Sequence, residues 1–259
     1  MSSAYNKQLI FDIGMHIGQD TDFYLAKGFK VIAIEANPLL VQEAEVKFAE
    51  PIKNQHLKIL NVGIDDKNGE FSFYVNDTYS EWSSFIKEIG ERGGIYHEIT
   101  VPCVTMDKIF AQYGVPYYLK VDIEGNDIQV VKHLHTLKQK PKYVSVENGN
   151  EGLLETLHEA GYTQFKFINQ AKVSEMKCPK PSLEGKDVDY QFAMGSSGPF
   201  GEETVGTWKS YEQVAQEIEA YWSIPDRDAN IHGWYDLHAK WESSNEWFGF
   251  KRLLKFLPG

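Results

Sequence analysis

Short apolar runs alternate with amphipathic stretches through the first part of the chain. Residues 8–13, 30–35 and 57–62 are apolar runs of strand length, and the segments between them carry apolar residues at helical spacing. Gly28 is placed to end the first helix, and Asn37 followed by Pro38 offers an N-cap and a first turn to the second. This order predicts an α/β fold, with a mostly parallel sheet covered by helices on both faces.

The pattern changes in the middle of the chain and again near its end. Residues 69–76 and 97–105 alternate like exposed strands, and the polar, glycine-bearing stretch between them predicts a loop or lid. Strands are then expected at 117–123, 142–147, 164–169 and 188–194, with helices at 105–114, 126–137 and 150–162. We therefore expect a main domain at 1–194 and an extension at 195–259, helical and aromatic, that packs on the core as a cap.

Composition narrows the class of protein. The chain has 259 residues and a net charge of −11, which argues against a nucleic-acid partner bound through phosphate neutralisation. No apolar run has the length of a transmembrane segment, and no signal peptide is evident. Cys103 and Cys178 are too few for a disulfide framework, which favours a cytoplasmic location. The basic, apolar residues 250–259 fit either a helix packed on the domain or a segment lying on an anionic membrane.

The stretch "FDIGMHIGQDT", residues 11–21, joins the first strand to the first helix. It lacks the G-x-G-x-x-G pattern of dinucleotide-binding folds, although Gly14 and Gly18 allow close approach of the backbone to a ligand. Asp12 offers a carboxylate to an ammonium group, and the following helix offers free N–H groups to a carboxylate. Glu35 ends the second strand, where an acid can bind ribose hydroxyls. S-adenosylmethionine has an ammonium group, a carboxylate and ribose hydroxyls in one molecule, whereas NAD needs a pyrophosphate contact. A tight turn without a ligand is the alternative.

Four segments in order give a specific resemblance. "FDIGMHIGQDT", "VIAIEANP", "NVGIDDKNGEFSFYV" and "LKVDIEGND" resemble the FkbM family of S-adenosylmethionine-dependent methyltransferases over roughly residues 9–194. The resemblance implies a class I methyltransferase fold, with a Rossmann-like, seven-stranded sheet whose last strand is antiparallel. Many members are O-methyltransferases that act on sugar hydroxyls. It places the cofactor contacts at Asp12, Gly14, Gly18, Glu35, Asn37, Gly63, Ile64, Asp65 and Asp122.

Methyl transfer to oxygen needs an aligned acceptor and a group that removes a proton. Asp122 and Glu124 end the fourth strand on one side, and His16 lies in the cofactor loop, so these three are the catalytic candidates. Glu124 capping the next helix, and His16 as part of the wall, are the alternatives. Asp122, Glu147 and Asn148 form a possible oxygen-ligand set for magnesium or another divalent cation. Alternatively, Glu147 binds substrate hydroxyls or pairs with a lysine.

Two further stretches are candidates for acceptor binding. The family's serine-bearing loop corresponds to residues 79–85, and aromatic residues with polar neighbours at 231–241 suit the face and hydroxyls of a sugar. The alternative for residues 79–85 is an ordinary exposed turn. The alternative for residues 231–241 is a surface whose tryptophans are buried against the core. The substrate-binding candidates are Trp82, Ser83, Ser84, Glu147, His232, Trp234 and His238.

The sequence thus predicts an S-adenosylmethionine-dependent O-methyltransferase for a hydroxyl of a sugar, glycan or glycosylated natural product. The expected partner is a small-molecule or glycan acceptor, and a homo-oligomer is possible. The competing hypotheses are N-methylation or another, non-sugar acceptor, a non-catalytic cofactor-binding module, and an NAD-dependent oxidoreductase.

Overall fold

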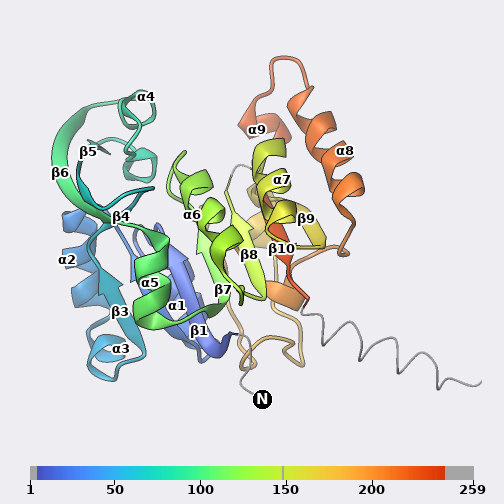
Figure 1. Ribbon diagram of the computed structural model, residues 1–259, viewed down its shortest axis with the longest axis horizontal. Helices are drawn as coiled ribbons and strands as arrows, with labels where there is room; N and C mark the ends of the chain where they lie inside the picture. The colour runs from blue at the N-terminus through green and yellow to red at the C-terminus, as the bar shows by residue number, and fades with distance from the viewer. Residues whose placement is uncertain (1–4, 148, 243–259) are drawn as a thin grey trace, which may run out of the picture.

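A seven-stranded sheet forms the core of the computed structural model, which describes residues 5–147 and 149–242 (Figure 1). The strand order is β3-β2-β1-β7-β8-β10-β9. The strands β3, β2, β1, β7 and β8 run parallel to one another, whereas β10 is antiparallel to both of its neighbours. This confirms the predicted class I methyltransferase fold. The strands are β1 (Asn6–Ile13), β2 (Lys30–Ile34), β3 (Leu57–Leu60), β7 (Pro116–Val121), β8 (Tyr143–Val146), β9 (Gln164–Asn169) and β10 (Tyr235–Lys240).

Helices bury apolar residues on both faces of this sheet. One face packs against α5 (Met106–Tyr113), α6 (Asp127–His133), α7 (Glu151–Glu159) and α8 (Tyr211–Trp222). The other face packs against α1 (Gln19–Ala26), α2 (Pro38–Lys47) and the irregular stretch at 170–209. Other short helices are α3 (Ala49–Lys53), η2 (Leu134–Thr136), η3 (Gln170–Glu175), η4 (Gly201–Glu203) and α9 (Ala229–His232).

Local signals account for several helix ends. Asn37 caps α2 by accepting a hydrogen bond from the Leu39 N–H, with Pro38 in the first turn. Gly114 follows α5 with a φ of 82°, a conformation that glycine adopts without strain. Among the described residues, no helix has the length and apolar character needed to cross a membrane.

A second, three-stranded sheet stands over the carboxyl ends of the main strands (Figure 1). Its order is β4-β6-β5, and the connection between β5 and β6 contains two short helices. We call this unit, residues 63–104, the small sheet. Both alternating strands predicted there are confirmed, and the expected loop or lid lies between them. Its elements are β4 (Gly63–Ile64), β5 (Gly69–Asn76), η1 (Ser80–Trp82), α4 (Lys87–Gly90) and β6 (Tyr96–Val104).

The last strand of the main sheet is not where the sequence placed it. Residues 188–194 form no strand; Phe192 instead packs its ring against Phe23 of α1, with centroids 4.8 Å apart. The missing strand is β10, which pairs with β8 on one side and β9 on the other. Part of the stretch expected to cap the core therefore lies inside the main sheet. Residues 250–259, for which the sequence fits either a packed helix or a segment lying on a membrane, are outside the described residues.

Candidate active site

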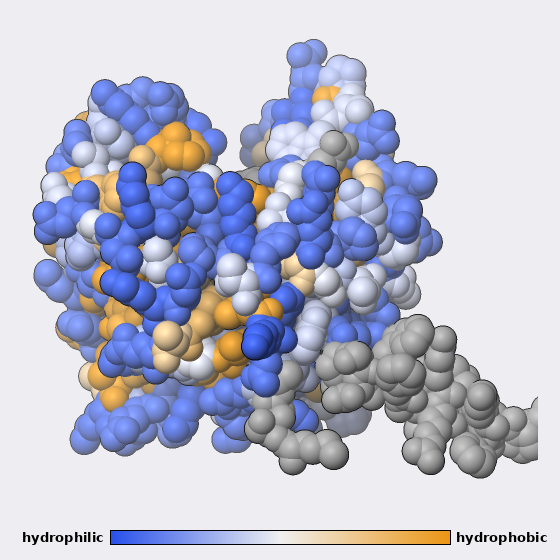
Figure 2. Space-filling view, in the orientation of Figure 1, coloured by the Kyte–Doolittle hydropathy of each residue, from blue (hydrophilic) through white to orange (hydrophobic). Residues whose placement is uncertain are grey.

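A cavity of about 730 Å³ opens at the carboxyl ends of the main strands. The molecule is hollowed between the small sheet and the part that carries α7, α8 and α9 (Figure 2), and residues from both sides line the cavity. This is the edge of a parallel sheet where ligands bind. The cavity brings together the predicted residues Gly14, His16, Glu35, Gly63, Ile64, Trp82, Ser83, Asp122, Glu124, Glu147 and Trp234.

Other predicted residues lie outside the cavity lining: Asp12, Gly18, Asn37, Asp65, Ser84, His232 and His238. Three of them support the lining from behind, as the following paragraphs show. His232 instead places its ring Nδ1 3.1 Å from the Asp228 carbonyl oxygen. His238 is only 2% exposed, and burial lowers its pKa to about 3. Its side chain is therefore a neutral core group away from the cavity wall.

Both glycines of the β1–α1 turn are needed for contacts within the protein. Gly14 has a φ of 81°, and a Cβ on it would lie 1.7 Å from the Asp122 carbonyl oxygen. Gly18 has a φ of 75°, and a Cβ there would lie 2.5 Å from the Phe48 ring. Gly14 thus lets the turn pack on the end of β7 while its backbone faces the cavity. Gly18 serves the packing of α2 rather than a ligand.

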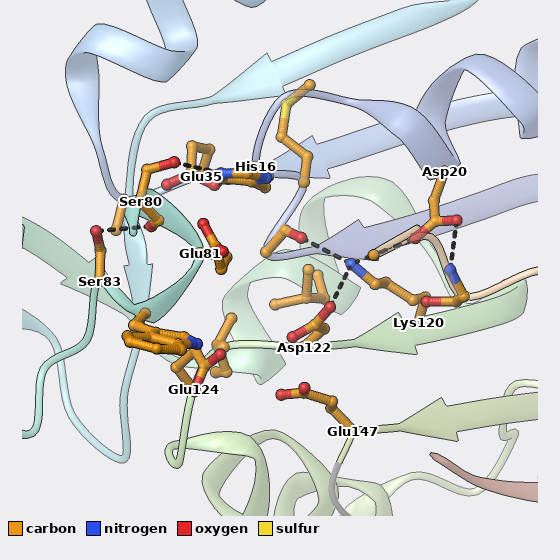
Figure 3. Close-up of a pocket in the computed structure, with 18 of the residues that line it drawn as sticks. His16, Asp20, Glu35, Ser80, Glu81, Ser83, Lys120, Asp122, Glu124 and Glu147 are labelled. Atoms are coloured by element: carbon orange, nitrogen blue, oxygen red, sulfur yellow. Dashed lines mark hydrogen bonds and ion pairs between the residues drawn. The ribbon is translucent and has the colours of Figure 1, made fainter. Parts of the chain in front are cut away.

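Glu35 is held with its carboxylate at the cavity wall. One oxygen accepts a hydrogen bond from the His16 N–H at 2.9 Å, and the other from the Asn37 N–H at 2.8 Å (Figure 3). Burial raises the pKa of Glu35, and these two N–H groups oppose that shift. A carboxylate has about four acceptor positions, so two remain for other donors. The geometry therefore suits binding of two neighbouring hydroxyls, as in a ribose.

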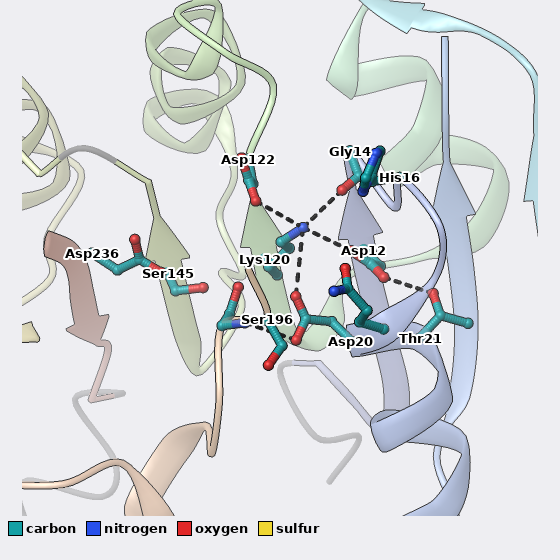
Figure 4. A network of polar contacts seen from close by, with 12 residues as sticks. Asp12, Gly14, His16, Asp20, Thr21, Lys120, Asp122, Ser145, Ser196 and Asp236 are labelled. Carbon is teal, nitrogen blue, oxygen red and sulfur yellow. Dashed lines mark hydrogen bonds and ion pairs between the residues drawn. The ribbon is translucent and has the colours of Figure 1, made fainter. Parts of the chain in front are cut away.

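A buried lysine that sequence reasoning missed joins the strands beneath the cavity. The Lys120 Nζ lies 2.7 Å from the Gly14 carbonyl oxygen, 3.3 Å from carboxylate oxygens of Asp12 and Asp122, and 3.8 Å from one of Asp20 (Figure 4). Burial works against its charge, but the surrounding carboxylates raise the pKa of Lys120 well above its usual value. We call these four side chains the Lys120 cluster.

The Lys120 cluster fixes the role of Asp12. This side chain is fully buried, and its second carboxylate oxygen accepts a hydrogen bond from the Thr21 hydroxyl at 2.6 Å. Asp12 therefore organises the cluster from behind the cavity instead of facing an ammonium group in it. Burial raises the pKa of Asp20 to about 6, and Lys120 opposes that shift.

Glu124 occupies a strained position that its neighbours hold in place. Its φ is 48°, in the left-handed region that residues with side chains seldom adopt. The Asp127 carboxylate accepts hydrogen bonds from the Ile123 and Gly125 N–H groups at 3.2 and 3.1 Å, and the Ser84 hydroxyl donates to the Glu124 carbonyl at 2.7 Å. Ser84 thus positions Glu124 and does not line the cavity. Burial, with the nearby Asp122 carboxylate, raises the pKa of Glu124 to about 8.

The small sheet contributes the opposite wall through η1. The His16 Nε2 lies 2.8 Å from the Ser80 hydroxyl oxygen, so a side-chain contact joins the β1–α1 turn to η1 (Figure 3). Burial lowers the pKa of His16, which favours its neutral form. The Trp82 ring lies 4.3 Å from the Arg92 guanidinium carbon. Ser80, Glu81 and Arg92 also line the cavity. Ser80 and Glu81 belong to the predicted stretch 79–85 without having been named in it, and no motif in the sequence marked Arg92.

Two carboxyl groups line the far wall. Glu147 follows β8, and Asp236 lies in the adjacent β10. One oxygen of each, Oε2 of Glu147 and Oδ1 of Asp236, is buried without a hydrogen-bond partner in the described part of the chain. Burial, reinforced by Asp122, raises the pKa of both groups well above the usual range. Trp234, which immediately precedes β10, also lines the cavity.

The predicted metal set is not supported. Asp122 and Glu147 line the cavity, but Asp122 already faces the Lys120 ammonium at 3.3 Å, and Asn148 lies outside the described residues. Within residues 5–147 and 149–242 no group of three or more His, Cys, Asp or Glu side chains is arranged to hold a metal ion.

Comparisons with known proteins show which sequences and structures the chain resembles. The sequence model of the Methyltransferase FkbM domain matches residues 12–164. Among solved structures, a methyltransferase FkbM from Methylobacillus flagellatus is 15% identical, with a TM-score of 0.39; the match covers 57% of this chain and 34% of that one.

Two further solved structures match most of the chain. A precorrin-6y C5,15-methyltransferase from Geobacter metallireducens is 8% identical over 91% of this chain and 80% of that one, with a TM-score of 0.39. An rRNA methylase from Streptococcus thermophilus is 6% identical over 93% of this chain and 90% of that one, with a TM-score of 0.38. No curated protein with significant sequence similarity was found.

Proposed function

Because this chain belongs to the FkbM family of S-adenosylmethionine-dependent methyltransferases, we propose that it methylates a hydroxyl of a sugar, glycan or glycosylated natural product. The observation that carries the proposal is Glu124, a carboxyl group with a pKa of about 8 in the same cavity as the β1–α1 turn and Glu35. A hydroxyl must lose its proton as it is methylated, and a base with a pKa near neutrality suits that task.

The residues of the cavity fit the cofactor that the family implies. Glu35 has two free acceptor positions for the ribose hydroxyls, and the apolar wall around Gly63, Ile64 and Phe85 suits the adenine ring. The carboxyl groups of the lining favour a cation. When bound, S-adenosylmethionine supplies a methyl group made reactive by its sulfonium. The Gly14 turn, held by Lys120, would keep the methionine part beside Asp122.

We assign the proton transfer to Glu124. The other two catalytic candidates are engaged elsewhere in this geometry, because Asp122 is paired with the Lys120 ammonium and the His16 Nε2 lies against the Ser80 hydroxyl. The ionised Glu124 carboxylate would accept the hydroxyl proton as the acceptor oxygen gains its methyl group. Asp122 and His16 then act as positioning residues, while the small sheet shields the reacting atoms from water.

The test is transfer of tritiated methyl groups from S-adenosylmethionine into a panel of sugars and glycans by the pure protein. Glu124→Gln should lower turnover by about a hundredfold or more, the usual contribution of a general base, while S-adenosylhomocysteine affinity stays within a factor of about three. Glu45→Gln, an exposed acid on α2, is the matched control and should change neither. Full turnover in Glu124→Gln, or label recovered only on nitrogen, would contradict the proposal.

A further inference from the structure

Glu147 and Asp236 form an acidic pair on the acceptor side of the cavity. Leu237 of β10 pairs with Val146 of the antiparallel strand β8, and Asp236 and Glu147 are the next residues beyond that pair. The Asp236 carboxyl group is also close enough to contribute to the raised pKa of Glu147. Asp236 is only 5% exposed, and its other oxygen accepts a hydrogen bond from the Gln170 amide at 2.9 Å. Each acid keeps one buried oxygen with no partner among the described residues. Figure 3 shows the Glu147 carboxylate pointing into the cavity.

Among the described residues, the cavity lining supplies no free cation for this pair. Of residues 5–147 and 149–242, seven carboxyl groups and two basic side chains line the cavity. The Lys120 ammonium is surrounded by three carboxylates of its own cluster, and Arg92 lies over the Trp82 ring. The cofactor would bring a sulfonium, an ammonium and a carboxylate, and so a net charge of only +1. Buried carboxyl groups without partners are costly, so such a site is completed by a ligand that brings donors or a positive charge.

We propose that the acceptor carries an ammonium group, as an amino sugar does, and that Glu147 and Asp236 bind it while a hydroxyl is methylated. This inference rests on the proposed function, because it assigns the far wall of the same cavity to the acceptor. An ammonium offers three donors and a full positive charge, so it satisfies both free oxygens at once, which a neutral hydroxyl does not. Trp234 on the same wall provides an apolar surface for the sugar ring.

The test compares two disaccharides that differ in this group alone: β-1,4-linked glucosamine disaccharide, and cellobiose, which has hydroxyls in place of the amines. With S-adenosylhomocysteine present, calorimetry of the wild-type protein should show the amino disaccharide binding at least about tenfold more tightly. Glu147→Gln and Asp236→Asn should each reduce that preference to about threefold or less, whereas Glu45→Gln preserves it. S-adenosylhomocysteine affinity should change in none of them.

Three results would overturn the inference. The first is equal affinity of the wild-type protein for the two disaccharides, a comparison that needs no variant to fold. The second is an unchanged preference in both variants. The third is a loss of S-adenosylhomocysteine affinity in the variants with the disaccharide preference intact, which would place the pair at the cofactor. Failure of wild-type protein to bind S-adenosylhomocysteine would instead contradict the proposed function, so the two failures are distinguishable.

Discussion

Replacing Lys120 by methionine tests whether the Lys120 cluster stabilises both the fold and the cavity. The Lys120 side chain is 4% exposed, and its removal leaves the buried Asp12 carboxylate without a counter-ion. Breaking a buried ion pair from one side costs about 3–5 kcal/mol, a large part of the 5–15 kcal/mol by which proteins of this kind are stable. For a chain of this size that corresponds to a fall in Tm of roughly 6–20 °C. Urea unfolding followed by circular dichroism measures the free energy of unfolding directly.

A second buried pair supplies the control. Lys27 and Glu203 are joined at 2.8 Å with neither side chain exposed, and neither residue lines the cavity. We expect Lys27→Met to lose similar stability but to keep its affinity for S-adenosylhomocysteine, whereas Lys120→Met loses both. Adding Asp12→Asn to Lys120→Met should recover part of the stability, because it removes the unpaired charge. A loss below about 1 kcal/mol in Lys120→Met, or equal ligand weakening in both lysine variants, would refute this reasoning.

Three further outcomes are expected. The value of kcat/KM should rise with pH up to about 8 and level off above it, because Glu124 must be ionised to accept a proton. A flat pH profile in the wild-type protein, or an unchanged rise in Glu124→Gln, would exclude this role of Glu124. Gly14→Ala should destabilise the fold by more than about 2 kcal/mol in urea unfolding, because its Cβ would lie 1.7 Å from the Asp122 carbonyl oxygen; wild-type stability would show that this contact is wrong. His16→Ala removes the hydrogen bond to Ser80, so hydrogen exchange at residues 80–84 should quicken, consistent with a loss of about 1 kcal/mol, while exchange in β9 stays unchanged.

The parts of the fold predicted from sequence are those with strong local signals. The parallel strands are buried on both faces, so each appears as an apolar run, and caps such as Asn37 mark where helices begin. The convergence of Gly14, Glu35 and Asp122 on one cavity followed from the same reasoning, because the carboxyl ends of parallel strands meet at one edge.

The parts missed depend on contacts between distant segments. β10 alternates apolar and polar residues, as a strand with one exposed face would, although Asp236 and His238 are buried in the structure. Residues 188–194 show a similar alternation without forming a strand, so the pattern alone did not distinguish the two segments. Nothing in the spacing of Asp12 and Lys120 indicates that they meet. The available signal was a lysine inside the apolar run 117–123, since a charge in a buried strand requires a partner.

Titration of S-adenosylhomocysteine into the wild-type protein, Glu35→Ala and Glu45→Ala by calorimetry tests the central claim most directly, namely that this cavity binds the methyl donor. We expect micromolar affinity in the wild type and in Glu45→Ala. Glu35→Ala should weaken binding at least about tenfold, because it loses a charge-assisted contact to two hydroxyls while keeping the fold by circular dichroism. No binding by the wild-type protein, or equal affinity in Glu35→Ala and the wild type, would contradict the account.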